Sequence, residues 1–464
     1  MNDPVVTAIP GQPNFLLGAF DIASLGYGVE EFFIAGRASS YTPVGELGAD
    51  GHWTVTTAGE ADYATRIVVL KPPDSAKFNG TAIVEWLNVT GGIDAPAEWF
   101  MAHREIVRAG YAYVAVSVQR VGVEGGQSRG GADMSLKTID PGRYAQLSHP
   151  GDAFSYDIFS QAGRLARGGL LGSLTPDHVL AAGESQSTMF LTTYINAVDP
   201  LAMVYDGFLV HSRFASAGPL DGGSMFAEQV SGMPEAPKFR LDARVPILAV
   251  ITETDLLGGP RPGYYLARQP DNARLRTWDI AGTAHADNYT ILGARIDSGS
   301  APIEQLAAAY APTKFLMGVE LEQAINFAPQ HHYVVQAALD ALHRWARSGE
   351  AAPVSPRLEL SEADPPQLVL DGNGLAEGGI RTPWVDVPVA RTSGVGDAGN
   401  VMASLFGSGE LFDAATLARL YPGGVDDYLA RFEEALDRAI GSGFLLPADR
   451  REILDLAVAM YPPA

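Results

Sequence analysis

One serine of this chain lies in a turn whose neighbours would expose it for chemistry. Ser185 is the centre of Gly-Glu-Ser-Gln-Ser, residues 183–187, between an apolar run at 177–182 and a helical pattern at 187–198. Small residues at both ends permit a tight turn, which leaves the hydroxyl at the start of a helix, where free backbone N–H groups favour an anion. Ser187 stands where a second glycine is commoner in such turns, but it is also small. We therefore predict that Ser185 is a nucleophile.

A nucleophilic serine needs a base, and nine histidines are available. His285 is the strongest candidate, because it lies in a short Gly/Ala loop directly after a predicted strand at 274–280. We predict that His285 takes the proton from Ser185.

The base in turn needs a carboxylate that orients it. An apolar run at 245–251 ends in Thr-Glu-Thr-Asp, residues 252–255, which offers two acids. We favour Asp255, with Thr252 in the place of a turn-forming glycine, and keep Glu253 as the alternative. Ser185, the acid and His285 then follow one another in the chain order Ser, Asp, His, each after a predicted strand.

An acyl-transfer site also needs donors for the developing oxyanion. One is the backbone N–H of Gln186, directly after the serine, and the second comes from the loop within 85–99, "EWLNVTGGIDAPAEW". By position the second donor is Val89 or Thr90, and we take Val89. Asn88 is expected to shape this loop and to contact the substrate.

Three other histidines are candidates for a binding role. His211 ends a predicted strand at 205–211 and either contacts the substrate or is a buried, hydrogen-bonded residue. His331 and His332 begin a predicted helix, where neighbouring residues point to different faces and no acidic residue at i+4 completes a metal site. We expect them to cap the helix or line a pocket, and we predict no metal and no other cofactor.

Short apolar runs rich in β-branched residues alternate with segments of helical period through the first 350 residues. The middle runs are apolar almost throughout, which indicates strands covered on both faces, so we predict the α/β class with an open, mostly parallel sheet and helices on both faces. The predicted strands are 30–36, 64–71, 81–87, 111–118, 177–182, 205–211, 245–251 and 274–280. The main predicted helices between them are 96–110, 152–168 and 187–198.

The predicted organisation is a core at 1–350 with a cap insertion at about 212–243, followed by a C-terminal extension at 351–464 that packs on the core. The extension is expected to hold an extended pair or edge strand at 378–390 and helices at 425–443 and 447–461. Four large apolar residues of the insertion would line a pocket or form the insertion's own small core. They are Met225, Phe226, Met233 and Phe239.

Composition excludes several classes of partner. The formal charge is −22, from 54 acidic and 32 basic residues, so we expect neither nucleic-acid binding nor a peripheral membrane protein. No run approaches the roughly 20 apolar residues of a membrane span. Cysteine is absent, which removes disulfides and thiolate chemistry. The N-terminus lacks a basic start and an apolar stretch, so the expected location is cytoplasmic, although a mature secreted form would look the same.

The chain resembles the α/β-hydrolase superfamily, and within it a branch of large bacterial "alpha/beta hydrolase domain" proteins. The motifs that carry the resemblance, between about residues 80 and 390, are "VEWLNVTGG", "HPGDAFSYDIFSQAG", "GESQS", "ITETD" and "GGIRTPWVDVPVA". The resemblance implies serine-dependent hydrolysis of a small-molecule ester through an acyl-enzyme, with Ser185, His285 and an acid within 252–255. Acyl transfer, amide cleavage by the same residues, or a non-catalytic binding module are the alternatives, and a homo-oligomer stays open.

Overall fold

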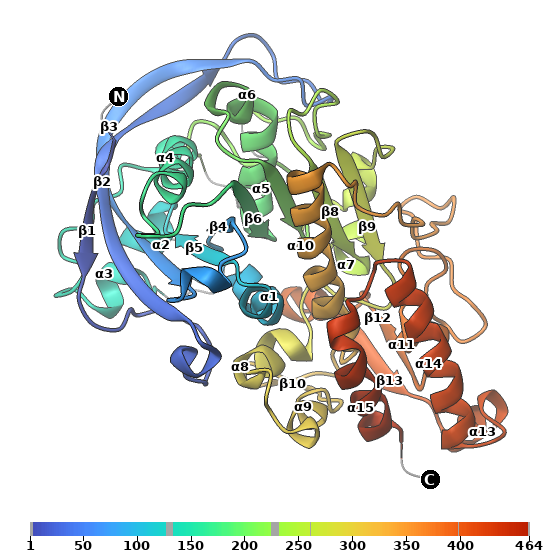
Figure 1. The fold of residues 1–464 in the computed structure, drawn as a ribbon. Coiled ribbons are helices and arrows are strands. Elements are labelled where there is room, and N and C mark those ends of the chain that lie inside the picture. Colours follow the sequence, from blue (N-terminus) through green and yellow to red (C-terminus); the bar gives the residue numbers. More distant parts are fainter. Residues whose placement is uncertain (1–2, 127–132, 224–231, 260, 398, 463–464) are drawn as a thin grey trace.

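A sheet of nine strands runs through the computed structural model, which describes residues 3–126, 133–223, 232–259, 261–397 and 399–462 (Figure 1). The strand order is β1-β2-β3-β5-β4-β6-β7-β8-β9. From β5 to β9 neighbouring strands are parallel, whereas β1, β2 and β3 pair antiparallel at one side. The strands are β1 Val5–Ile9, β2 Gly28–Pro43, β3 Val55–Lys71, β4 Thr81–Trp86, β5 Ala112–Val116, β6 His178–Glu184, β7 Gly207–His211, β8 Ile247–Thr252 and β9 Leu275–Ile280.

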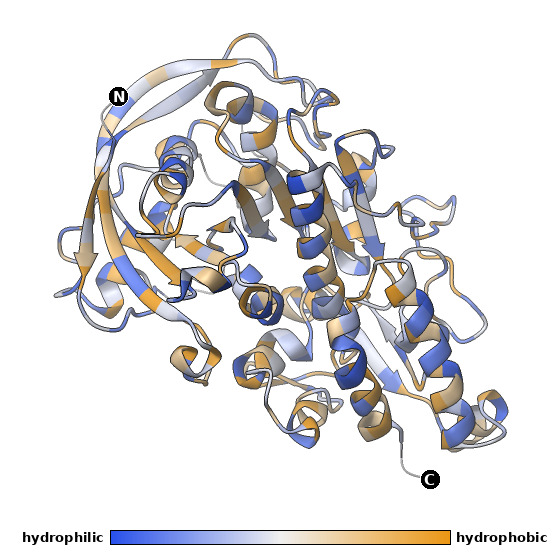
Figure 2. Ribbon diagram, viewed as in Figure 1, coloured by the Kyte–Doolittle hydropathy of each residue, from blue (hydrophilic) through white to orange (hydrophobic). Residues whose placement is uncertain are grey.

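The central strands are buried on both faces, as their sequences require. In β6, Val179 and Ala181 face one hydrophobic cluster and Leu180 and Ala182 face the other, because alternate side chains point to opposite sides of a strand. The helices α4 (Ser155–Arg167) and α5 (Gln186–Thr193) contribute to the first cluster, and α1 (Ala97–Arg108) and α10 (Gln330–Ser348) to the second. Figure 2 shows hydrophobic and hydrophilic residues together along α1, α4 and α10, whereas all residues of α5 are buried.

Short elements and the C-terminal part of the chain complete the fold. Figure 1 shows α8, α9 and β10 (yellow) near the C-terminal helices (red), and α9 and α15 are in contact. α14 and α15 add apolar residues to the cluster that α1 and α10 share. The remaining elements are α2 Arg120–Glu124, α3 Leu136–Ile139, α6 Asp199–Ala202, α7 Glu253–Leu257, α8 Ala294–Ile296, α9 Ile303–Ala309, β10 Phe315–Leu316, β11 Val319–Glu320, α11 Pro383–Asp386, β12 Ala390–Ser393, α12 Val401–Leu405, β13 Ser408–Leu411, α13 Ala414–Leu420, α14 Val425–Gly441 and α15 Arg450–Met460.

The segment 378–390 differs from its expected extended form. Ile380 makes a single parallel bridge to β9, and α11 then begins at Pro383, which suits the first turn of a helix because proline lacks an N–H. Pairing resumes only at β12, whose partner is β13. Met225 and Phe226 lie outside the described residues, and the division of the chain at residue 350 stays a prediction.

Candidate active site

The turn around Ser185 has a strained backbone geometry. Ser185 lies between β6 and α5 with φ 56° and ψ −115°, a conformation that costs energy for a residue with a side chain. Its N–H donates to the carbonyl of His211 over 2.9 Å, which fixes the turn to β7. A Cβ on Gly183 would lie 2.9 Å from Leu191 and 3.0 Å from Ser187, so a larger residue there would force these side chains to shift. Ser185 itself is half-buried and can be reached.

Asp255 and His285 meet at the ends of β8 and β9. The Nδ1 atom of His285 lies 2.6 Å from Asp255 Oδ1, and both residues are buried. The other carboxylate oxygen, Oδ2, accepts the N–H and the hydroxyl of Thr252 over 2.9 and 2.7 Å. Asp255 is the third residue of α7 and closes a capping box with Thr252, so the helix start holds the carboxylate in place.

Opposing effects act on the protons of this pair. Burial lowers the pKa of His285, but the charge and hydrogen bond of Asp255, and the charge of Glu184, raise that pKa above its ordinary value. Burial raises the pKa of Asp255, whereas the charge of His285 and hydrogen bonds from His285 and Thr252 bring that pKa below its ordinary value. The site therefore favours an ionised Asp255 beside a ring that can accept a second proton.

Glu253, the alternative acid, faces a different part of the chain. Its Oε1 accepts the N–H of Gly282 over 2.6 Å, and its Oε2 accepts the N–H of Gly394 over 2.7 Å and the hydroxyl of Ser393 over 3.0 Å. Burial raises its pKa to about 7, against the effect of these donors. Glu253 thus connects the C-terminal extension to the loop of His285.

A third carboxylate, which was not among the candidates predicted from the sequence, lies on the other side of the His285 ring. Glu184 Oε1 is 3.4 Å from Nε2 of His285, and Asn88 Nδ2 donates to Glu184 Oε2 over 3.0 Å and to its carbonyl over 3.2 Å. Burial raises the pKa of Glu184 to about 7, although His285 and His211 act to lower it. Asn88 therefore contacts the residue before the serine. The motif contains Glu184, so its position beside Ser185 was the available signal.

The expected oxyanion loop contacts the residue after the serine. The Val89 N–H donates to Gln186 Oε1 over 3.1 Å, and the Thr90 N–H donates to Asn88 Oδ1 over 2.8 Å. Gln186 Nε2 in turn donates to Gln119 over 2.8 Å. The N–H of Val89 thus lies beside α5 and donates to the side-chain oxygen of Gln186. The N–H of Gln186 belongs to the first turn of α5.

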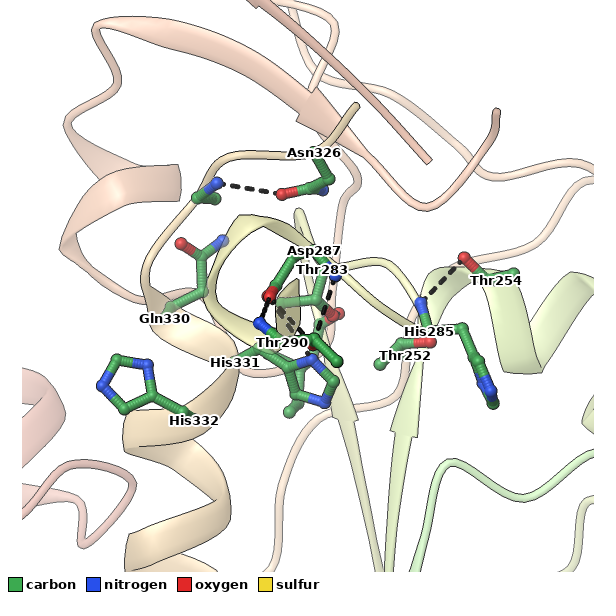
Figure 3. A network of polar contacts seen from close by, with 12 residues as sticks. Thr252, Thr254, Thr283, His285, Asp287, Thr290, Asn326, Gln330, His331 and His332 are labelled. Carbon is green, nitrogen blue, oxygen red and sulfur yellow. Dashed lines mark hydrogen bonds and ion pairs between the residues drawn. The ribbon is translucent and has the colours of Figure 1, made fainter. Parts of the chain in front are cut away.

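The remaining candidates lie below or beside the site. His211 is 1% exposed, and its ring meets His331. Phe214, within the predicted insertion, lies with its ring 5.2 Å from that of His285. Figure 3 shows His285 beside Thr254 on one side of the loop after β9, and Asp287, Thr290 and His331 on the other. Among the residues that the structure describes, no group of three or more acidic or histidine side chains is arranged to hold a metal.

A family model described as "Alpha/beta hydrolase domain" matches residues 2–455. This chain belongs to the α/β-hydrolase family. Its sheet and its strand-turn-helix at residues 178–193 agree with that membership. No curated protein matches the sequence. Within the described part of this α/β hydrolase, no helix has the length and apolar character that a membrane crossing needs.

Solved structures give distant likenesses to this α/β hydrolase. A putative dienelactone hydrolase from Klebsiella pneumoniae is 11% identical with a TM-score of 0.29, over 60% of this chain and 95% of the other. An α/β serine hydrolase without a lid from Xanthomonas campestris is 13% identical with a TM-score of 0.29, over 53% and 86%. A glucuronoyl esterase from Solibacter usitatus is 10% identical with a TM-score of 0.31, over 60% and 82%.

Proposed function

We propose that this α/β hydrolase cleaves a small carboxylic ester through an acyl-enzyme on Ser185. The observation that carries the proposal is the accessible serine on a strained turn at the same sheet edge as the His285–Asp255 pair. Parallel strands bring their carboxyl ends to one edge, so β6, β8 and β9 can supply one residue each to a single reaction. The proposal requires no cofactor.

In the proposed mechanism, Nε2 of His285 takes the hydroxyl proton as Ser185 Oγ attacks the ester carbonyl. The carbonyl oxygen becomes the oxyanion, which the N–H of Gln186 and the loop at 88–91 stabilise. At the N–H of Val89, this oxyanion would replace the side-chain oxygen of Gln186 as the acceptor. The C–O bond to the alcohol then breaks, and the alcohol leaves with the proton from Nε2. Water repeats the sequence on the acyl-enzyme and releases the acid. Asp255 keeps the ring in the required tautomer throughout.

A fluorophosphonate label and a burst assay with p-nitrophenyl acetate and butyrate test the nucleophile. We expect one label per chain and rapid release of the first equivalent of nitrophenol, and we expect Ser185→Ala to abolish both. Ser187→Ala is the matched control, because its hydroxyl is buried in the same turn without a hydrogen-bond partner. It should keep label and burst. Labelling that persists in Ser185→Ala, at a site identified by mass spectrometry, would contradict the proposal.

Replacing Glu184 with glutamine is expected to move the acidic limb of kcat/KM to lower pH. The Glu184 carboxylate helps to raise the pKa of His285, and the reaction needs the ring without its second proton at the start. Without this negative charge the ring loses its proton at lower pH, so activity persists further into acid. The plateau should fall by about tenfold, about 1.4 kcal/mol, because the imidazolium formed during attack is less stabilised.

A pH profile of kcat/KM with a neutral ester measures this shift. Glu304→Gln, at an exposed position, is the control and should leave the profile unchanged. A limb that stays in place in Glu184→Gln, or moves to higher pH, would show that Glu184 does not act on His285 through its charge.

A further inference from the structure

A second polar cluster lies within the core near the site. Glu98 is in the first turn of α1, His211 ends β7, His331 is in the first turn of α10, and Asp287 follows His285 by two residues. None of the four is more than 2% exposed. We refer to Glu98, His211, His331 and Asp287 as the buried chain. Four separate segments thus bring ionisable side chains together in the interior of the protein.

The four residues touch in a fixed order. The two imidazoles meet through their Nε2 atoms at 2.8 Å, with the ring planes at 76°. The Nδ1 atom of His211 lies 3.3 Å from Glu98 Oε1, and the Nδ1 atom of His331 lies 3.7 Å from Asp287 Oδ2. The order is therefore Glu98, His211, His331, Asp287, with a carboxyl group at each end and two rings between.

These contacts account for buried atoms that otherwise lack partners. Both oxygens of Glu98 and the Nδ1 atoms of His211 and His331 are buried without a hydrogen bond. Three of these four atoms face another member of the buried chain. A contact between two Nε2 atoms requires one ring to donate and the other to accept. With both rings neutral, the proton positions along the buried chain are therefore linked, and only two arrangements of these protons exist.

The surroundings of the two carboxyl groups distinguish these arrangements. Asp287 Oδ1 accepts the N–H of Thr290 over 3.0 Å and its hydroxyl over 3.2 Å, which stabilises a negative charge. Glu98 receives no such donor, and the carboxyl groups of Glu85 and Glu184 disfavour a further negative charge there. The charge therefore belongs at the Asp287 end and the extra proton at the Glu98 end.

We propose that the buried chain carries one negative charge, on Asp287, with Glu98 protonated, and that it positions the oxyanion loop, the serine turn and the histidine loop relative to one another. The hydroxyl of Glu98 donates to Nδ1 of His211, and the Nε2–H of His211 donates to Nε2 of His331. The Nδ1–H of His331 points to the Asp287 carboxylate. The protonation pattern holds whether or not the protein is an esterase; the positioning role rests on the function proposed above.

The directions of the pKa shifts within the buried chain agree with this protonation pattern. Burial raises the pKa of Glu98 to about 8, against the effect of His331, and burial lowers the pKa of His211 to about 4, against Glu184 and Asp255. A neutral acid next to neutral rings follows. The titratable groups that face Glu98 from the elements around it are Glu85, Tyr113, Glu184, His211 and His331.

The buried chain is also connected to the three segments that it is proposed to position. The carbonyl of His211 accepts the N–H of Ser185, so His211 belongs to the serine turn through its backbone. Glu98 opens the helix that follows the oxyanion loop, and its own N–H donates to Glu85 over 3.0 Å. Asp287 lies on the loop that presents His285 (Figure 3). A shift of either ring would move these three segments apart.

Nitrogen NMR of the protein labelled with ¹⁵N-histidine tests the protonation pattern without reference to activity. At pH 7 we expect two neutral rings of opposite tautomer, His211 protonated at Nε2 and His331 at Nδ1, with a coupling between their Nε2 atoms. His331→Gln assigns the pair, and His343→Gln, which changes another buried histidine of α10, should leave both signals in place. The reverse tautomers, or a cationic ring, would overturn the proposal.

Substitutions at Glu98 test the neutral acid. The amide of Glu98→Gln can donate to Nδ1 of His211 as the protonated acid does, so its kcat/KM at pH 7 should stay within about threefold of the wild type. Glu98→Leu removes the donor, and its kcat/KM should fall at least tenfold with KM for a small ester little changed. Equal losses in the two variants would show that the carboxylate charge is needed. If the leucine variant does not fold, the NMR experiment still tests the proposed protonation pattern.

Unfolding at several pH values gives a further readout. Because the pKa of folded Glu98 is raised, the folded state keeps a proton that the unfolded state releases, and its contribution to stability is lost as pH rises from about 4.5 to 8. Glu98→Gln does not titrate, so its denaturant midpoint should rise relative to the wild type over this range. The midpoint difference for exposed Glu304→Gln should stay constant. A constant difference for Glu98→Gln would contradict a protonated Glu98.

Discussion

Replacing His285 with glutamine is expected to lower kcat/KM for p-nitrophenyl butyrate by about 10⁶-fold, because serine and histidine act as one unit and the loss of either removes covalent catalysis. Glutamine fills most of the space of the ring beside Phe214 but cannot accept a proton from Ser185 at neutral pH. The fold should survive, since the ring is at the sheet edge rather than in a hydrophobic cluster. Initial rates, with labelling by the fluorophosphonate, measure the loss.

His343→Gln is the matched control for this result. His343 is also a buried histidine, and its Nδ1 lies 2.9 Å from the hydroxyl of Thr81, at the start of β4 rather than at the carboxyl ends of the strands. Its substitution should change the denaturant midpoint but not kcat/KM by more than a few-fold. If His285→Gln keeps more than a hundredth of the wild-type rate, another group is the base and the proposed triad is wrong.

The central strands of the sheet were predictable from the sequence, since strands buried on both faces are largely apolar. The runs at 81–87, 177–182 and 245–251 correspond to β4, β6 and β8 for this reason. The conformation of segment 378–390 was not predictable, because it depends on one bridge of Ile380 to β9 and on the helix that begins at Pro383. Contacts with distant strands determine the structure of such segments, and the local sequence periodicity does not reveal those contacts.

The site was predictable only as far as chain position determines it. Ser185, Asp255 and His285 each follow a strand of a parallel sheet, so their common edge could be inferred. The contact of Glu184 with Nε2 could not, because it depends on the rotamer at the strained turn. The contact between His211 and His331 could not be predicted either. The two histidines are 120 residues apart in the sequence, and their elements come together only in the folded protein.

Asp255→Asn is expected to lower kcat by about 10⁴-fold while the protein stays folded. The asparagine oxygen can keep both hydrogen bonds from Thr252, which turns its NH₂ group toward His285. That donor requires a lone pair on Nδ1, so the single ring proton moves to Nε2. A ring protonated at Nε2 cannot take the proton of Ser185. Initial rates and the pH profile measure the effect, and the loss should persist at every pH between 6 and 9.

Glu253→Gln separates the two acids of the same short helix. The new amide would bring an NH₂ group against the N–H of Gly282 or that of Gly394, and two donors cannot pair, so the free energy of unfolding should fall by about 1–3 kcal/mol. The rate of the folded enzyme should change by less than about tenfold, because Glu253 does not touch the His285 ring. The reverse outcome, an inactive Glu253→Gln beside an active Asp255→Asn, would transfer the orienting role to Glu253. Similar losses of rate in both would mean that α7 acts as a rigid support, and that the 2.6 Å contact of Asp255 with His285 is not the decisive one.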